Sequence, residues 1–252
     1  MARIKGGAGS KSTKVKRAQA SQVKKHIKKP PLVRIARTAV PARVRLPRAA
    51  ATARPAPRYF SHPQYGPSSN VGGASWMRAI IGPAQGAVEH YGSRPAANTP
   101  GVMRSLLDDG GLNDFGWIAG HLLNDNLGGP GVACNLTPLT TAGNKNHLNT
   151  CETAIKNFII AAYSRTLLNK ADTHWFGVDY RVAVSDEKWV AGHKSLSHVA
   201  THLIISAKVV MQEKSSGAIS DAGSGDCPIT CYFAPMADVR VDNTGYDNLQ
   251  IL

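Results

Sequence analysis

The sequence predicts an α+β domain with an antiparallel sheet and one long helix, preceded by a disordered basic arm. Apolar residues recur at helical spacing between residues 144 and 168, and they alternate with polar residues in two later segments. Strands that flank one long helix along the chain favour antiparallel pairing. The third observation is the charge: none of the 16 acidic residues precedes Glu89, whereas 18 of the 30 basic residues do.

Residues 1–58 form the expected basic arm. They hold 17 Lys and Arg and six prolines, but no Phe, Trp, Tyr, Asp or Glu. Such a segment cannot bury enough apolar surface to offset its ordering entropy, so we expect it to be disordered. Its charge suits phosphate binding by counterion release, solubilisation or targeting. An organelle transit peptide is a further interpretation, which Pro30 and Pro31 disfavour because they interrupt a long amphipathic helix.

Several protein classes are excluded by composition. The longest apolar runs, such as residues 158–162, are far shorter than the roughly 20 residues that a membrane-spanning helix needs. No apolar stretch of the kind found in secretory signal peptides follows the basic N-terminus. Four cysteines are too few for a disulfide scaffold in a chain of 252 residues.

Residues 59–95 are expected to be a linker or docking segment made of ordered loops. Aromatic side chains such as Tyr59 and Trp76 stand there among Gly, Ser and Pro. The main globular domain is expected over residues 96–252.

This domain contains the predicted helix and strands. Within it, we expect the long helix at residues 144–168, with Thr140 or Thr141 as its N-cap. Strands are expected where apolar side chains alternate on one face, at residues 175–184, 199–211 and about 232–241.

The chemistry is concentrated between the first predicted strand end and the long helix. The apolar run 117–119 leads into His121, and Gly-Gly-Pro-Gly at 128–131 predicts a rigid, sharply turning loop. The chain then returns through Asn135 to the helix start at Asn144. A neutral His is the usual general base near pH 7, and an Asn oxygen is a hard ligand that suits Mg²⁺. Taken singly, these residues also suit a plain histidine and a helix cap, but their order and spacing indicate a reaction pocket.

The run GHLLNDNLGGPGVACNLTPLT at 120–140, followed by AGNKNHLNTCE at 142–152, resembles a known family. It is similar to the DNA/RNA non-specific endonuclease family of bacterial polymorphic toxins, which belongs to the ββα-metal, or His-Me finger, nucleases. The likeness is strong over these residues and looser over 100–211. It implies a ββα-metal nuclease core with an antiparallel sheet and one long helix.

The resemblance also implies roles for three residues. His121 matches the general base that deprotonates the attacking water. Asn144 matches the direct protein ligand of a divalent metal, Mg²⁺ or Mn²⁺, and Glu152 matches the acid that orients metal-bound water. Eight residues of α-helix rise by about 12 Å, so Asn144 and Glu152 do not easily share one inner coordination shell.

Substrate contacts are expected from neighbouring residues. Asn135 is expected to shape the pocket, and His147 either touches substrate or lies on the helix surface. Ala119 stands where related nucleases often have an Arg that clamps the substrate phosphate. That cation is therefore missing or comes from elsewhere, and Lys145 could partly substitute for it.

We therefore expect a metal-dependent, non-specific nuclease that hydrolyses DNA or RNA phosphodiesters as an interbacterial toxin effector. The resemblance implies a toxin that acts in the cytoplasm of a target cell, and the missing apolar stretch fits secretion without a signal peptide. Its partners would be nucleic acid, an immunity or inhibitor protein and a component of a secretion apparatus. The alternative is a catalytically inactive nucleic-acid-binding or packaging protein on a nuclease-like fold, which the basic arm also suits.

Other metal and cysteine signals are weak. His198 and His202 would bind zinc together only on a helix, whereas the alternation around them predicts a strand. Cys134 and Cys151 flank the motif and are expected to be free thiols or, in an oxidising compartment, a disulfide.

Overall fold

The computed structural model describes residues 58–83, 92–97, 99–109, 112, 115–189 and 194–243. Over these residues the chain is an α+β structure with an antiparallel sheet and one long helix, as the sequence predicted. The basic arm expected over residues 1–58 lies outside the described residues, except for Arg58, at which the first strand begins.

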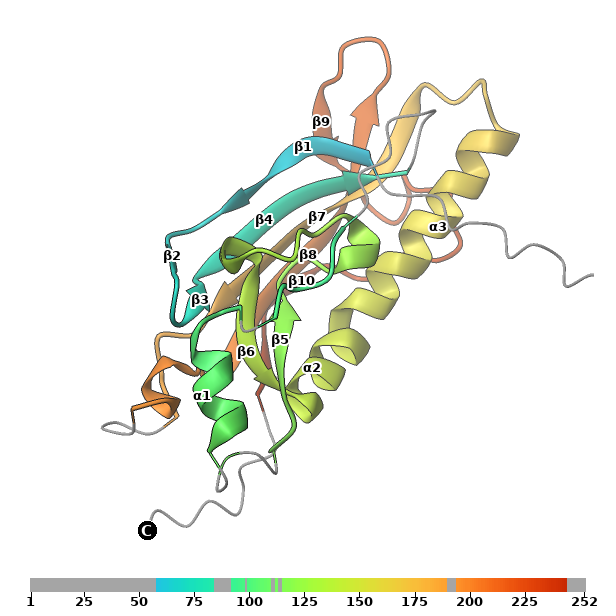
Figure 1. Ribbon diagram of the computed structural model, residues 1–252. Helices are drawn as coiled ribbons and strands as arrows, with labels where there is room; N and C mark the ends of the chain where they lie inside the picture. The colour runs from blue at the N-terminus through green and yellow to red at the C-terminus, as the bar shows by residue number, and fades with distance from the viewer. Residues whose placement is uncertain are drawn as a thin grey trace, which may run out of the picture. The chain divides into compact units, whose positions relative to one another are not determined.

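The main sheet has six strands in the order β1-β4-β7-β8-β10, with β9 also paired to β8 (Figure 1). Every pairing in it is antiparallel. Its strands are β1 (Arg58–Tyr65), β4 (Trp76–Gly82), β7 (His174–Val184), β8 (His202–Glu213), β9 (Ile219–Asp221) and β10 (Met236–Asp242).

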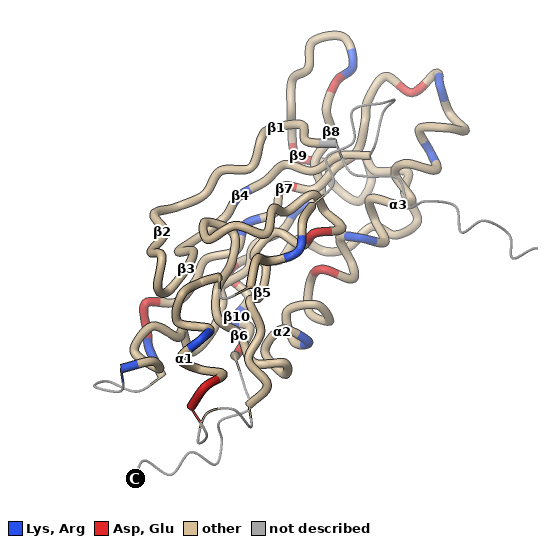
Figure 2. The backbone as a smooth tube through the Cα atoms, viewed as in Figure 1, with Lys and Arg blue, Asp and Glu red and all other residues tan. Residues whose placement is uncertain are grey.

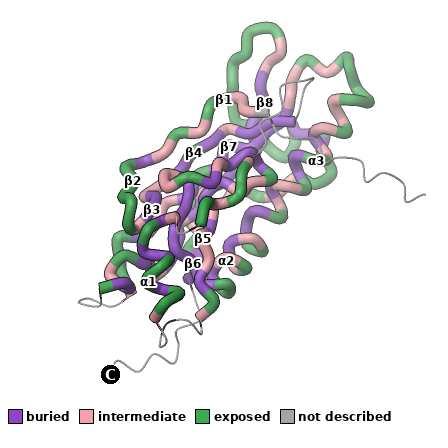
Figure 3. The backbone as a smooth tube through the Cα atoms, viewed as in Figure 1, coloured by how far each residue is buried: buried purple, intermediate pink, exposed green. Residues whose placement is uncertain are grey.

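The strands expected at residues 175–184 and 199–211 are confirmed as β7 and β8, and the last one as β10. The alternation has the expected cause. Val178, Tyr180 and Val182 are fully buried in the main core, whereas Arg181 between them is exposed. Buried residues accordingly follow the central strands in Figure 3.

The long helix packs on one face of this sheet. It comprises α2 (Thr141–His147), a π-helical turn (Leu148–Glu152) and α3 (Thr153–Leu168). Thr140 is the N-cap, because its hydroxyl accepts a hydrogen bond from the Gly143 N–H at 2.8 Å. The predicted helix and one of its two predicted caps are confirmed. The side chains that the helix buries in the core are Cys151, Ile155, Phe158, Ile159 and Ala162.

A separate pair of strands precedes the helix. β5 (Trp117–His121) pairs antiparallel with β6 (Leu136–Thr140), and α2 begins at the next residue. The order along the chain is therefore strand, strand, helix. The short helix α1 (Val102–Asp108) packs near β5 in a second apolar cluster, and β2 (Ser68–Ser69) pairs with β3 (Gly73–Ala74). The buried members of that cluster are Val102, Met103, Leu106, Leu112, Trp117, Leu196 and Val199.

Residues 59–95 differ from the expected loops. β1 and β4 are strands of the main sheet, and β4 pairs with the central strand β7. Met77, Ala79 and Ile81 alternate along β4 and are buried in the main core, so this segment is an integral part of the sheet. The Gly, Ser and Pro residues around β4 concealed this pattern. The expected domain start at residue 96 thus falls after two strands of the sheet.

Basic and acidic residues are interspersed along the described elements (Figure 2). Among the described residues, no helix combines the length and the apolar character that crossing a membrane requires.

Candidate active site

The candidate site is built on the segment that connects β5 to β6. His121, the last residue of β5, is partly buried and lies opposite Leu136 in the strand pairing. Two short 3₁₀ turns, Asp125–Leu127 and Ala133–Asn135, fold the segment back onto itself. The structure therefore places His121 at a strand end, beside a compact loop, as the sequence predicted.

Asn135 holds this loop together from inside. Its side chain is fully buried, and its Oδ1 accepts the Leu123 N–H at 2.8 Å. Its Nδ2 donates to the carbonyl oxygens of Leu123 at 2.9 Å and Pro130 at 3.0 Å. Asn135 therefore organises the β5–β6 loop, and its expected part in shaping a substrate pocket stays a prediction. Because the amide is fully engaged with the loop backbone, the structure gives it no role in direct substrate contact.

The glycines of the loop are required by its geometry. Gly128 ends the first 3₁₀ turn with φ of 91°, a left-handed conformation that L side chains rarely adopt. A Cβ at Gly129 would overlap the Leu123 carbonyl oxygen. The loop is thus tightly closed by backbone contacts.

His121 is oriented by a backbone carbonyl. Its Nε2 lies 2.9 Å from the carbonyl oxygen of Ser93. A carbonyl can only accept a hydrogen bond, so Nε2 must carry the proton and donate. In the neutral ring the lone pair then resides on Nδ1, which makes no hydrogen bond to another described residue. The contact fixes the tautomer in which Nδ1 can accept a proton.

The segment that contains Ser93 crosses over the β5–β6 loop. The Ser93 N–H donates to Gly129 O at 3.2 Å, and the Ser93 hydroxyl accepts the Gly131 N–H at 2.8 Å. Gly92 N–H also donates to Asp125 O at 3.1 Å. Sequence reasoning missed Ser93, because it lies in the supposed linker and contacts His121 through a backbone atom.

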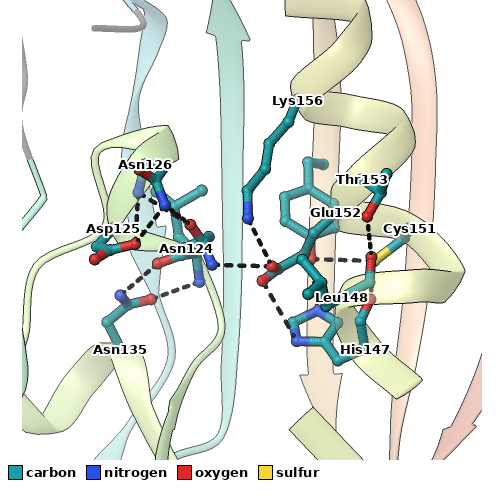
Figure 4. A network of polar contacts seen from close by, with 12 residues as sticks. Asn124, Asp125, Asn126, Asn135, His147, Leu148, Cys151, Glu152, Thr153 and Lys156 are labelled. Atoms are coloured by element: carbon teal, nitrogen blue, oxygen red, sulfur yellow. Dashed lines mark hydrogen bonds and ion pairs between the residues drawn. The ribbon is translucent and has the colours of Figure 1, made fainter. Parts of the chain in front are cut away.

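Glu152 reaches the same loop from the helix, at the end of the π-helical turn. Its side chain is buried, and its Oε2 accepts hydrogen bonds from Asn124 Nδ2 at 2.9 Å and Lys156 Nζ at 3.1 Å (Figure 4). Asn124 is three residues after His121, so this hydrogen bond connects the helix to the β5–β6 loop. Lys156 offsets the negative charge of the buried carboxylate.

His147 corrects two expectations. It is neither on the helix surface nor placed to touch substrate, because it is fully buried between the helix and β7. Its Nε2 lies 2.7 Å from the Tyr180 hydroxyl, and its Nδ1 lies 3.6 Å from Glu152 Oε1. Burial lowers the pKa of His147 below its usual value, despite the opposing effect of Glu152. His147 is a neutral core residue that supports the helix–sheet contact.

Two further titratable groups complete this buried contact. The Cys151 thiol donates to the His147 carbonyl oxygen and lies near the Tyr180 hydroxyl. Burial raises the pKa of Cys151 to about 12 and the pKa of Tyr180 well above its usual value. Both groups are therefore neutral near pH 7. All four cysteines of the chain are free thiols.

Asn144 and Lys145 lie on α2. Asn144 is partly buried, and its side chain makes no hydrogen bond to another described residue. Lys145 is exposed. Neither makes a direct polar contact with His121 within the described part of the chain. The polar link between the helix and the β5–β6 loop is the hydrogen bond from Asn124 to Glu152.

The oxygen donors of Asn144 and Glu152 suit a hard divalent cation. One is a neutral amide oxygen with no protein partner among the described residues, and the other is a buried carboxylate. Mg²⁺ prefers oxygen donors and retains several waters, so a small number of protein ligands is enough.

In the described ranges no three or more His, Cys, Asp or Glu residues form a metal-binding group. Of the two histidines considered for zinc, His198 lies in a 3₁₀ turn and His202 in β8.

Ala119 has no charged group, and it packs against the second apolar cluster. Arg94 is exposed and directly follows Ser93. A carbonyl oxygen lies about 3 Å from the next Cα, so the Arg94 Cα is within about 6 Å of His121 Nε2, given the 2.9 Å contact. Arg94 is thus a nearby source of a guanidinium that the sequence motif did not reveal.

Comparisons of the chain with protein-family models, with curated proteins and with solved structures gave no match.

Proposed function

We propose that the chain is a metal-dependent, non-specific nuclease with a ββα-metal core formed by β5, β6 and the long helix. It would hydrolyse phosphodiester bonds of DNA, RNA or both. The observation that carries the proposal is the contact between His121 Nε2 and the Ser93 carbonyl, which leaves Nδ1 as a proton acceptor at the loop.

In this mechanism Nδ1 of His121 accepts the proton of the attacking water. The ring becomes positively charged, and the Ser93 carbonyl stabilises it because a charge-assisted hydrogen bond is stronger than a neutral one. Arg94 and Lys145, both exposed, are the cations available to bind substrate phosphates.

Asn144 and Glu152 would hold the metal site, Asn144 directly and Glu152 through bound water. A bound Mg²⁺ ion would neutralise charge on the scissile phosphate and on the leaving oxygen. Asn124 and Lys156 fix the carboxylate of Glu152 before substrate arrives.

An effector role is part of the same proposal. The protein would be delivered into a target cell, act in the cytoplasm of that cell, and be restrained in its producer by an immunity protein. The basic residues 1–58 would bind nucleic acid or engage the secretion apparatus.

A second candidate is a nucleic-acid-binding or packaging protein that lacks catalysis. Ala119 supports it, because this position lacks the Arg of related nucleases. An assay of plasmid nicking and RNA cleavage, with Mg²⁺ and with EDTA, separates the two. The nuclease proposal expects turnover that requires the metal, whereas the alternative expects stoichiometric binding without cleavage.

A further inference from the structure

The long helix contains one residue more than a regular α-helix would over the same turn. The Thr153 N–H donates to the Leu148 carbonyl, five residues earlier, which is the π-helical pattern. The Thr153 hydroxyl donates to the same carbonyl at 2.9 Å. Asn149 and Thr150, within this turn, are exposed.

This extra residue changes which side chains share a face. An α-helix turns by about 100° per residue, so eight regular residues would leave Asn144 and Glu152 about 80° apart. With one residue absorbed by the π-helical turn, the separation is equivalent to seven residues. Seven residues fall within about 20° of two complete turns. Asn144 and Glu152 therefore lie on nearly the same face.

The pattern of burial along the helix supports this alignment of Asn144 with Glu152. In a regular helix, residues 7, 11 and 18 positions apart share one face. Asn144 would then lie in line with Cys151, Ile155 and Ala162, which are all buried in the core. Instead Asn144 is only partly buried.

His147 lies on the buried side of the helix, three residues after Asn144. It is fully buried against Tyr180. The π-helical turn thus keeps Asn144 out of the core.

We propose that the π-helical turn at Leu148–Glu152 aligns Asn144 with Glu152 for metal binding, and that Thr153 is a positioning residue that holds this turn. The inference rests on the proposed nuclease function. It predicts that the alignment of Asn144 with Glu152 depends on the phase of the helix and not on the eight-residue spacing itself.

Two variants that change the length of the helix test this prediction. Deleting the exposed Asn149 converts the turn to a regular α-helical turn, and Asn144 and Glu152 stay aligned at a seven-residue spacing. Inserting one alanine between Asn149 and Thr150 rotates the two side chains apart by about 100°.

The measurement is Mn²⁺ binding to metal-free protein by electron paramagnetic resonance, together with Mg²⁺-dependent plasmid cleavage. The deletion variant should keep the parent's Mn²⁺ affinity and activity. The insertion variant should lose about 10–100-fold in affinity, the usual effect of disturbing groups that orient a metal ligand. Thr153→Val should weaken Mn²⁺ binding, and Thr153→Ser, which retains the hydroxyl, should restore it.

The deletion variant decides the outcome, because the insertion can unfold the helix. Loss of Mn²⁺ affinity in a folded deletion variant, with the parent active, overturns this inference and leaves the nuclease function intact. A parent that neither binds Mn²⁺ nor cleaves nucleic acid overturns both.

Discussion

The Nε2 atom of His121 lies 2.9 Å from the carbonyl oxygen of Ser93, a residue 28 positions earlier in the chain. The partner atom is a pure acceptor, so the contact determines which ring nitrogen is protonated. The segment around Ser93 is therefore part of the site, although along the chain it lies between β4 and α1, well before β5.

Replacing Ser93 by alanine should slow the reaction without abolishing it. The substitution removes the hydroxyl that accepts the Gly131 N–H and so loosens the segment whose carbonyl orients His121. Because such a hydrogen bond contributes about 1 kcal/mol, we expect kcat to fall by roughly three- to tenfold, with little change in KM. Ser197→Ala is the matched control, since that hydroxyl donates to the Lys194 carbonyl, three residues earlier, and makes no hydrogen bond to the β5–β6 loop among the described residues. Equal kcat values for the two variants would contradict the assigned role.

Asn144→Ala should raise the Mg²⁺ concentration needed for half-maximal cleavage. The direct ligand would be lost, whereas the His121 loop and Glu152 would remain in place. Loss of a ligand should weaken the metal site at least as much as loss of a supporting group, about 10–100-fold, and excess Mn²⁺ should restore part of the activity. The exposed neighbour Asn149→Ala should behave like the parent. A metal titration unchanged by Asn144→Ala argues against this ligand.

The buried His147 predicts a dependence of stability on pH. Burial lowers its folded-state pKa, whereas the unfolded value stays near 6.5. The unfolded chain therefore binds more protons as the pH falls below about 6.5, and the free energy of unfolding decreases there. Above that pH the contribution of His147 is fully present.

Urea denaturation in EDTA checks this dependence between about pH 5 and pH 8. His147→Gln should reduce the slope, because the glutamine does not titrate. It should also cost about 1–3 kcal/mol if the Tyr180 hydroxyl loses its partner. A slope identical to that of the parent would show that other groups cause it.

Removing residues 1–57 should flatten the salt dependence of nucleic-acid binding. The cut preserves Arg58, at which β1 begins. Each phosphate contact that is lost reduces the slope of log affinity against log salt by about 0.9 on duplex DNA. Fluorescence anisotropy at several salt concentrations measures this slope. If it does not change, the arm serves delivery or solubility instead.

The parts of the fold that follow a short-range pattern were predictable. The helix and strands β7 and β8 each repeat an apolar period that depends only on local geometry. The Thr140 cap was predictable because Thr is a preferred N-cap residue. β4 was missed because its alternation is short and is surrounded by Gly, Ser and Pro.

The remaining errors concern long-range contacts. His147 was expected to touch substrate or to lie on the helix surface, but it is buried and its Nε2 contacts the Tyr180 hydroxyl of β7. The role of Ser93 could not be predicted, because it depends on a carbonyl group that every residue possesses. His121 and Asn135 were predictable as parts of one loop, but the contact of Glu152 with Asn124 needed the folded chain.

The most direct test of the proposed function is cleavage of plasmid DNA and of RNA by the purified full chain in Mg²⁺, compared with His121→Ala. The account predicts turnover by the parent that EDTA abolishes, and a rate about 10²–10⁴-fold lower for His121→Ala with an unchanged melting temperature. The exposed His198→Ala should retain the parent's rate. A parent that cleaves neither substrate, or a folded His121→Ala variant as active as the parent, would contradict the account.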